Sequence, residues 1–358
     1  MKVSRWIALA IVAALVASIA ASAALGGGKA PAGTQKASAG FTAALVSDIA
    51  GFNDNGFNKN QLKGLNRAAA KFGLTAKPLV SHSASDYKPN YNTAVRDGAK
   101  VVIAAGYLLA PTITQYAGQF PNVDFAITDD SVTAAGGDFS KAAFTKDKAK
   151  YYVKNIEGIT YATQEAGCLV GVLAAKEAQS MGTENIGAVG GIEIPPVDSY
   201  IAGYQYCAQK AVPGTQVQVQ YSNSFTDESA CSSVAQNEIG SGAEVVFQVA
   251  GLCGDGALKE ASKLGKWGIG VDADEYHVAS RILTSAVKKT DVGVYDVIQQ
   301  VVQGKFKGDS DILLNLKNNG VGVGTISPKV PKAWISLMNG YRAKIVAGTL
   351  KPPAVVKK

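Results

Sequence analysis

Carboxylate side chains recur in this sequence at the points where apolar runs end. The first, Asp48, follows the run that begins at Phe41, and the set as a whole is Asp48, Asp129, Asp130, Glu193, Asp272 and Asp274. One such acid is usually a helix cap or a turn residue. A series of acids at the same end of successive runs is what a polar small molecule needs, because carboxylates accept hydrogen bonds from its N–H and O–H groups. The series predicts a small-molecule site.

Two aromatic side chains accompany these acids. Phe57 lies in the polar stretch from Asp48 to Asn58, and Tyr200 follows the pair Pro195-Pro196. Aromatic rings stack on flat ligands, although each ring could equally belong to a packed core.

Other site chemistries find little support in the sequence. Two histidines and the absence of a Cys-x-x-Cys pair argue against zinc, and no D-x-D-x-D-G loop is present for Ca²⁺. The glycines of residues 251–256 (GLCGDG) do not have the spacing of a dinucleotide fingerprint. A cysteine nucleophile has no evident histidine partner in the sequence, and only the fold can decide that point. We therefore expect a protein without metal or cofactor that is not an enzyme.

The alternation of apolar runs and helical spacing predicts the elements that must position these residues. Leu62, Leu65, Ala69 and Phe72 share one face of a helix, and Gly73 provides its end. Strands are predicted at 41–47, 76–80, 101–105, 124–128, 156–161, 185–190, 216–221, 244–250 and 268–272, with a short one near 282–285. Helices are predicted at about 57–72, 87–97, 111–119, 163–179, 197–211, 227–241, 255–264, 290–303 and 332–347.

This βαβ repetition predicts an α/β fold of parallel sheets covered by helices. Because 358 residues hold too many strands for one sheet of usual width, we expect two doubly wound lobes with a ligand cleft between them. The expected first lobe is 41–160 with about 276–310, and the second is 161–275 with about 311–350.

The N-terminal segment predicts export. Lys2 and Arg5 precede an apolar stretch, and Ala21-Ser22-Ala23 has the pattern of a signal-peptide cleavage site. Residues 1–25 are thus a signal peptide or, because of their length, an uncleaved anchor, and residues 26–40 form a flexible tether. The expected location is extracytoplasmic, in a periplasm or on the outer face of the cell membrane.

The positive charge of the chain does not indicate nucleic acid. The net charge is +7, and two of these charges belong to the N-terminal segment. The basic residues are scattered, and the densest cluster, residues 146–154, has the character of a solvated surface.

The four cysteines predict disulfides in an exported chain. Three pairings are possible. Cys231 is expected to open a helix and Cys253 to end the strand after it, which places both at one sheet edge. This favours Cys231 with Cys253 and Cys168 with Cys207, with buried free thiols as the alternative.

An ordered set of short motifs resembles the basic membrane protein family, the purine-nucleoside receptors of bacterial ABC importers. The motifs extend over about 40–349. They are 47–58 (SDIAGFNDNGFN), 125–129 (FAITD), 190–196 (GGIEIPP) with Tyr200 and 203–204, 248–251 (QVAG) with 254–256, 270–274 (GVDAD) and 283–289 (LTSAVKK).

The resemblance implies a type I periplasmic-binding-protein fold, in which two lobes with hinge crossovers close on a nucleoside. In this fold Phe57 and Tyr200 would sandwich the base, and Asn58 and Asp129 would bind its edge. The ribose would be held by Asp272, Lys288 and main-chain groups near Gly251, and Asp48 would shape the binding loop or reach the sugar. The implied partners are the ligand and the permease subunits of the transporter, with the receptor itself a monomer.

The sequence departs from the family pattern in three places. Gly56 stands for the usual Ser, Tyr200 for the usual Phe, and Leu252-Cys253 interrupts a loop usually made of glycine and threonine. The expected function is ligand binding for an ABC importer. The alternatives are a binding protein or sensor for another solute, such as a sugar, a flavin-like molecule or a signalling compound, and a nucleoside-processing enzyme.

Overall fold

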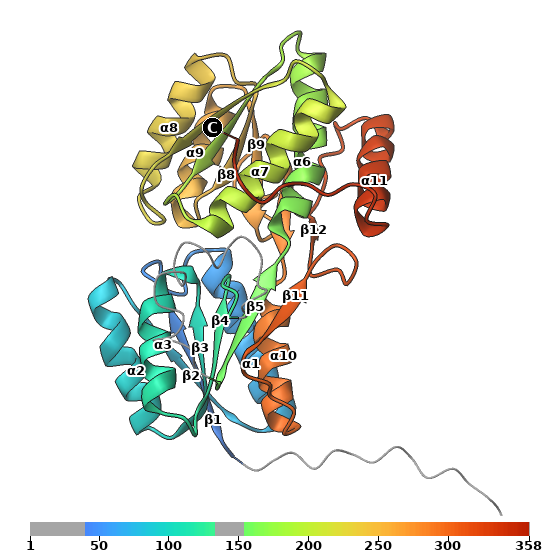
Figure 1. The fold of residues 1–358 in the computed structure, drawn as a ribbon. Helices are drawn as coiled ribbons and strands as arrows, with labels where there is room; N and C mark the ends of the chain where they lie inside the picture. Colours follow the sequence, from blue (N-terminus) through green and yellow to red (C-terminus); the bar gives the residue numbers. More distant parts are fainter. Residues whose placement is uncertain (1–39, 133–153, 358) are drawn as a thin grey trace, which may run out of the picture. The chain divides into compact units, whose positions relative to one another are not determined.

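The structure is a computed structural model that describes residues 40–132 and 154–357. The predicted signal peptide or anchor, and all but the last residue of the predicted tether, lie outside the described residues. Within the described ranges the strands form two six-stranded sheets, which belong to one compact unit of the chain. Two separate sheets of this kind confirm the expected two-lobed α/β architecture (Figure 1).

The first lobe is built on a sheet whose strands are all parallel, in the order β11-β5-β4-β3-β1-β2. Its strands are β1 (Thr42–Ser47), β2 (Thr75–Leu79), β3 (Ala99–Ala105), β4 (Asp124–Thr128), β5 (Ile156–Tyr161) and β11 (Ser310–Leu314). Its helices are α1 (Phe57–Phe72), α2 (Tyr87–Arg96), α3 (Ala110–Gln119) and α10 (Thr290–Val302), with short 3₁₀ turns η1 (Ala84–Asp86) and η2 (Tyr107–Leu109).

Alternation along the central strands explains how this sheet is covered on both faces. On β1, Ala43 and Leu45 pack in one apolar cluster with residues of α1 and α10. Ala44 and Val46 pack in another cluster with residues of α2 and α3. Successive side chains of a strand point to opposite faces, so an apolar run such as β1 is buried on both sides only when helices cover both.

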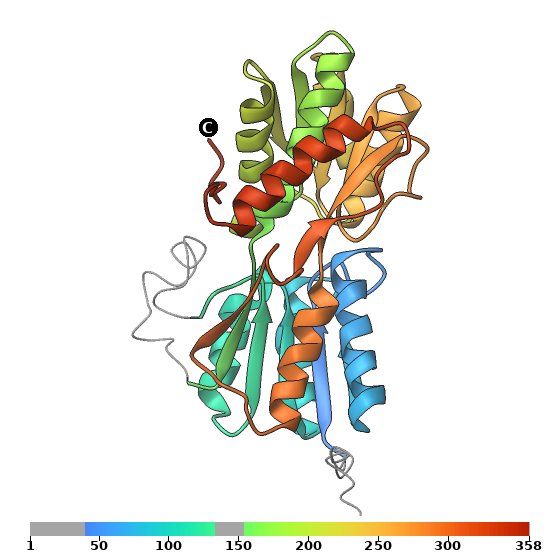
Figure 2. The ribbon, with the colours of Figure 1, turned by 90° about the vertical axis from the view of Figure 1, so that its right-hand side faces the viewer.

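The second lobe repeats this plan with the strand order β12-β10-β9-β8-β6-β7, in which only β12 is antiparallel. Its strands are β6 (Asn185–Gly190), β7 (Gln216–Tyr221), β8 (Val245–Val249), β9 (Trp267–Asp272), β10 (Ile282–Lys288) and β12 (Val321–Val323). Its helices are α6 (Thr163–Ser180), α7 (Pro195–Ala211), α8 (Glu228–Gly240), α9 (Leu252–Lys263) and α11 (Lys332–Val346). Figure 2 shows α11 lying across this lobe, where it packs against α6.

The sheet pairing corrects two of the expected lobe boundaries. Residues 276–310 were expected in the first lobe, but β10 pairs with β9 in the second sheet, and only α10 returns to pack on α1. Residues 311–350 were expected in the second lobe, but β11 pairs with β5 in the first sheet. Described elements therefore cross between the lobes after β5, β10 and β11.

Both favoured disulfides are confirmed, since Cys168 bonds to Cys207 and Cys231 bonds to Cys253. The expected position of Cys253 is wrong in detail. Strand β8 ends at Val249, and Cys253 lies in the first turn of α9, which begins three residues earlier than predicted. The predicted pairing is nevertheless correct, because Cys231 lies in α8, which packs against α9.

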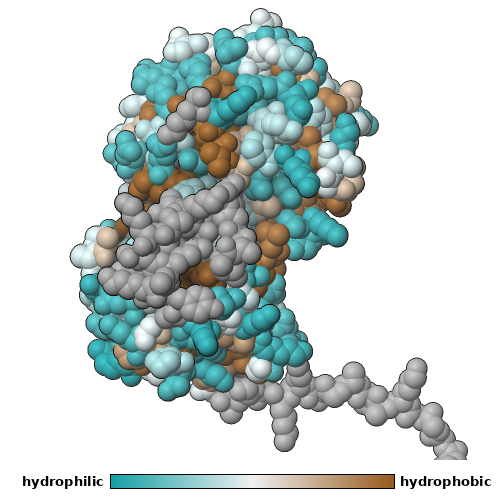
Figure 3. Space-filling model, viewed as in Figure 1, coloured by the Kyte–Doolittle hydropathy of each residue, from teal (hydrophilic) through white to brown (hydrophobic). Residues whose placement is uncertain are grey.

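The face of the molecule in Figure 3 is mixed in hydropathy. Hydrophilic residues predominate on the face that Figure 3 shows, with hydrophobic residues between them. Among the described residues, no helix combines the length and apolar character that a membrane crossing requires.

Candidate functional site

Loops at the carboxyl ends of the strands in both sheets line one pocket. Its empty volume is about 560 Å³, including solvent space at its mouth. All eight ligand-binding residues predicted from the sequence line it: Asp48, Phe57, Asn58, Asp129, Tyr200, Gly251, Asp272 and Lys288. Ligands of open α/β sheets bind at this edge, which makes the pocket the candidate site.

Lys288 is the electrostatic centre of the pocket. Its Nζ lies 2.7 Å from Asp129 Oδ2 on the first lobe and 3.3 Å from Asp272 Oδ1 on the second. The lysine side chain is only 3% exposed. Burial by itself lowers the pKa of Lys288, but Asp129 and Asp272 outweigh it and hold that pKa above its ordinary value. The lysine is therefore charged, and it links the two lobes.

Both partners of Lys288 have left-handed backbones at the ends of their strands. The φ angle is 66° at Asp129 and 60° at Asp272. Residues other than glycine seldom adopt this conformation, although asparagine and aspartate do so more often than most. Strained backbone of this kind is concentrated at functional sites. The loops thus turn sharply at the two acids, whose carboxylates converge on one ammonium group.

The long turn after β1 is organised by two further acids. Asp54 accepts hydrogen bonds from the backbone N–H groups of Gly56, Asn58 and Lys59, and so caps the start of α1. Asp48 accepts a bond of 2.7 Å from Asn58 Nδ2 and one from the Ala50 N–H. Burial raises the pKa of Asp48 to about 7, against which these two bonds act. Asn58 Oδ1 is buried and has no hydrogen-bond partner among the described residues.

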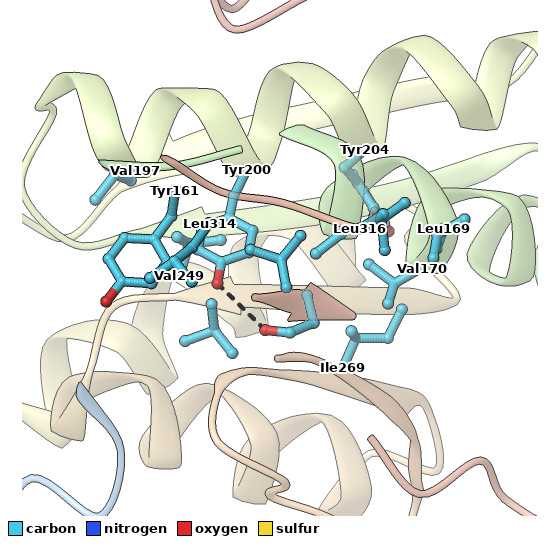
Figure 4. Close-up of a cluster of buried hydrophobic side chains, with 14 of the residues drawn as sticks. Tyr161, Leu169, Val170, Val197, Tyr200, Tyr204, Val249, Ile269, Leu314 and Leu316 are labelled. Carbon is cyan, nitrogen blue, oxygen red and sulfur yellow. Dashed lines mark hydrogen bonds between the residues drawn. The ribbon is translucent and has the colours of Figure 1, made fainter. Parts of the chain in front are cut away.

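The aromatic residues of the pocket differ in how accessible they are. Tyr200 is 1% exposed, and its hydroxyl donates to Asp272 Oδ1 at 3.1 Å and approaches the Ala286 carbonyl. Figure 4 shows Tyr200 within the buried apolar cluster. Phe57 and Phe225 are half-buried and come from opposite lobes. Sequence reasoning missed Phe225, whose only signal is an aromatic ring just beyond a strand end.

Each of these half-buried rings rests on a glycine. A Cβ added to Gly106, after β3, would lie 3.0 Å from Phe57 Cε1, and a Cβ added to Gly191, after β6, would lie 2.4 Å from Phe225 Cε1. Both rings therefore contact bare backbone, which fixes their positions at the wall of the pocket.

Three of the recurring acids are not among the residues that line this pocket. Glu193 is exposed, and Asp274 accepts hydrogen bonds from the backbone and hydroxyl of Thr325. Asp130 is buried in a small adjoining cavity that also includes Asp129 and Tyr161. No group of acids, histidines and cysteines suited to a metal occurs within 40–132 and 154–357.

Known proteins resemble this chain over most of its length. The ABC transporter nucleoside-binding protein BmpA of Lactococcus lactis is 30% identical over 93% of this chain and 97% of its own. A lipoprotein of Pyrococcus abyssi is 30% identical over 88% of this chain and 76% of its own. A crystal structure of an ABC transporter solute-binding protein from Aeropyrum pernix superposes with a TM-score of 0.73 at 24% identity, over 87% of this chain and 94% of the other. This last likeness shows the fold.

The sequence model of the Bmp family, described as ABC transporter substrate-binding protein PnrA-like, matches residues 41–354. The chain belongs to the Bmp family. As a Bmp protein it is a substrate-binding protein of an ABC transporter, which confirms the resemblance stated from its motifs and the expectation of a non-enzyme.

Behind the pocket of this Bmp protein, a buried carboxyl group braces two of its loops. Glu275 Oε2 accepts hydrogen bonds from the Val271 N–H at 2.9 Å and from Gln248 Nε2 at 2.6 Å. The Gln248 side-chain oxygen in turn accepts from the Ala250 N–H. This pair connects the chain before Gly251 with the chain before Asp272. Burial raises the pKa of Glu275 to about 8, from an ordinary value of 4.5.

The raised pKa of Glu275 predicts how stability depends on pH. A carboxyl group whose folded-state pKa exceeds its unfolded-state pKa stabilises the fold at low pH, and this contribution disappears as pH rises through the folded-state value. Between about pH 4.5 and pH 8, Glu275 should therefore make the unfolding free energy of the parent fall by up to about 1.4 kcal/mol per pH unit. This part of the fall should be absent in Glu275→Gln. Urea unfolding at several pH values measures this slope. The exposed Glu184, replaced in the same way, is the control, and equal slopes for the parent and Glu275→Gln would contradict the assignment.

Proposed function

We propose that this protein binds a purine nucleoside in the pocket and presents it to the permease of an ABC importer. The observation that carries the proposal is a pocket in which accessible aromatic rings from both lobes face a ligand space edged by carboxylates. The relative in Lactococcus lactis, which is named as nucleoside-binding, supports the same ligand class.

The rings are assigned to the faces of the base. A purine is flat and apolar on both faces, and each stacked ring contributes about 0.5–1.5 kcal/mol beyond its buried area. Phe57 supplies the ring of the first lobe. Phe225 is the better candidate in the second lobe, because Tyr200 is 1% exposed and its hydroxyl is bound to Asp272. Tyr200 then supports Asp272 from behind and closes the end of the pocket.

Acceptors are assigned to the edge of the base. One carboxylate oxygen of Asp129 accepts a hydrogen bond from Lys288, and its other oxygen makes no hydrogen bond with the described residues. Asn58 Oδ1 is a second acceptor without a partner. Two acceptors in the wall of one pocket suit the N–H groups of guanine or hypoxanthine, and bonds to a charged group are worth about 1.5–3 kcal/mol.

The remaining polar groups are assigned to the ribose. Asp272 accepts and Lys288 donates, so the two can serve neighbouring hydroxyls, with main-chain groups near Gly251 beside them. A 2′-deoxynucleoside offers one hydroxyl fewer and should bind less tightly.

The charge of the pocket selects against phosphorylated ligands. Four acids, Asp48, Asp54, Asp129 and Asp272, line it, with the pKa of Asp48 raised by burial to about 7, whereas Lys288 is the one cation among the described residues of its wall. A nucleotide would bring its negative charge into this acidic space, and like charges at close range disfavour one another. We therefore expect nucleosides to bind and nucleoside monophosphates to be rejected.

Closure of the lobes links binding to transport. Residues of both lobes line the site, so only the closed form makes every contact, and the ligand shifts the population towards that form. We place the protein outside the cytoplasmic membrane, as a monomer that is either released by signal cleavage or held by its N-terminal segment.

Replacement of Asp129 by asparagine tests the assignment of the base edge. The change keeps the size of the side chain and leaves Lys288 paired with Asp272, but it exchanges a charged acceptor for an amide. Guanosine affinity, measured by calorimetry, should fall at least about tenfold. Asp274→Asn, at a strand end outside the pocket wall, is the matched control. Unchanged affinity in Asp129→Asn would reject the role of this residue.

Direct identification of the ligand tests the proposal as a whole. Mass spectrometry of small molecules that co-purify with the native protein should find a purine nucleoside. Titrations with guanosine, inosine, GMP and D-ribose should show binding of the first two only. Recovery of intact guanosine after incubation is expected of a receptor, and release of the free base would indicate an enzyme. Tight binding of a free sugar with no response to nucleosides would replace the proposed ligand.

A further inference from the structure

The loop that carries Phe225 joins β7 to α8 and lies on the carboxyl end of β6. Its backbone is attached there by two hydrogen bonds, from the Ser222 N–H to the Gly190 carbonyl and from the Asn223 N–H to the Gly191 carbonyl. The Phe225 ring lies on the backbone of Gly191. The second half of the loop turns on Ser224 Oγ, which accepts from the N–H groups of Thr226 and Asp227.

A disulfide lies directly beneath this loop. Cys231 is in the first turn of α8 and Cys253 is in the first turn of α9, and both are fully buried. The Cys253 N–H donates to the Phe225 carbonyl at 3.1 Å. Ser222 Oγ lies 3.3 Å from the Cys231 sulfur and 3.4 Å from the Cys253 sulfur.

The same disulfide also holds the neighbouring loop of the pocket. Gly251, which lines the pocket, precedes Cys253 by two residues, and its φ of 56° makes the chain turn there. A Cβ added to Gly251 would lie 3.5 Å from the Phe225 carbonyl, so the two loops are in contact. One covalent link therefore fixes two adjacent parts of the wall.

We propose that the Cys231–Cys253 disulfide is a positioning element for the ligand, which holds Phe225 against the pocket and so sets how long the ligand stays. The inference deepens the proposed function and rests on it. Holding a stacking ring in place before binding removes an ordering cost from the complex, and such effects act mainly on the dissociation rate.

The second disulfide of the same lobe provides an internal control. Cys168 on α6 bonds to Cys207 on α7, and neither residue lines the pocket. On α7 the wall of the pocket ends at Tyr200, about two helical turns before Cys207. Loss of either disulfide should lower thermal stability, but only loss of Cys231–Cys253 should affect the Phe225 loop.

The experiment compares Cys231→Ala/Cys253→Ala with Cys168→Ala/Cys207→Ala. Stopped-flow binding of guanosine should show a dissociation rate raised about tenfold in the first variant, with the association rate within about twofold of the parent. The control variant should keep both rates. Equal dissociation rates in the parent and the first variant, or equal increases in both variants, would overturn the inference. If the alanine pair folds poorly, Cys231→Ser/Cys253→Ser carries the same expectation.

Coupling to Phe225 separates positioning from a general loss of structure. In a Phe225→Ala background, removal of the Cys231–Cys253 disulfide should change the dissociation rate by less than about twofold, because the ring on which it acts is gone. Additive effects of the two changes would contradict the inference.

Hydrogen exchange provides a readout that needs no ligand. Amides of residues 222–227 should exchange at least about tenfold faster without the Cys231–Cys253 disulfide, and those of the control variant should not. Unchanged exchange in this loop would overturn the inference. If the parent protein bound no nucleoside, the proposed function would fail, and the exchange result would still decide whether the disulfide positions the loop.

Discussion

Replacement of Lys288 by methionine should lower the free energy of unfolding by about 3–5 kcal/mol at pH 8. The ammonium group is buried between Asp129 and Asp272, whose side chains are 7% and 12% exposed. Without it, two carboxylates that converge from opposite lobes keep their desolvation cost and repel each other. Removal of one member of a buried ion pair is costly for this reason, whereas the intact pair need not stabilise the fold.

The loss caused by Lys288→Met should be smaller at pH 5 than at pH 8. Burial already raises the pKa of Asp129 above its ordinary value, against the opposing effect of Lys288, so loss of the cation should raise the pKa of this acid further. The protonated Asp129 carboxyl group then stabilises the variant at low pH, and this stabilisation is lost as pH rises through the folded-state pKa. Urea unfolding at the two pH values measures the difference. Lys259→Met is the control, because Lys259 and Glu228 are 53% and 42% exposed, and such a pair contributes at most about 1 kcal/mol. Equal stability of the parent and Lys288→Met would show that the acids are not desolvated together in solution.

The order of the elements was predictable from the sequence, whereas the choice of sheet was not. Helical spacing and buried runs are local signals, and the predicted helices and the first nine strands correspond closely to those of the structure. Which sheet a strand joins depends on partners far away in the chain. The pairing of Ile282 with Gly268 places β10 in the second lobe, although the helix after it packs in the first.

The two missed strands lacked a local signal. Strand β11 lies at the edge of its sheet with mostly half-buried side chains, and its sequence SDILL includes an acid. Strand β12 has only three residues, VGV. An edge strand buries little of its surface, so selection for alternating apolar residues is weak there.

Convergence of the pocket residues was predictable because parallel strands share their carboxyl edge. Asp48, Asp129 and Asp272 follow this rule and meet in the pocket. Asp274 follows it as well, yet the path of its loop turns it to Thr325. The exposure of Tyr200 could not be predicted, because the residues that cover a helix face come from other segments. A ring beyond a strand end, as at Phe225, has the same appearance in sequence whether it faces ligand or core.

Replacement of Phe57 by alanine should weaken the binding of guanosine, inosine and adenosine alike, by about 100-fold. The ring is half-buried at the first-lobe wall, with its position fixed by Gly106 beneath it and by a bond from the Thr290 hydroxyl to the Phe57 carbonyl. Its removal takes away a stacking term of about 0.5–1.5 kcal/mol and the burial of an aromatic surface worth about 1.5–3 kcal/mol. Neither term depends on the edge of the base, so the loss should not discriminate between purines.

The Phe57 ring also contacts Lys288, so the controls for this prediction must separate stacking from other losses. Lys288 Nζ lies 4.5 Å from the Phe57 ring centroid, so the alanine variant loses a cation–π contact as well. Phe57→Leu retains part of the apolar area but has no π face. Its affinity should therefore exceed that of Phe57→Ala only by the contribution of buried apolar area, without the stacking contribution. Tyr206→Ala removes a half-buried ring on α7 that is not part of the pocket wall, and calorimetry should find its affinity unchanged. A loss in Phe57→Ala confined to one nucleoside would mean that Phe57 recognises an edge, and the stacking role would have to be given up.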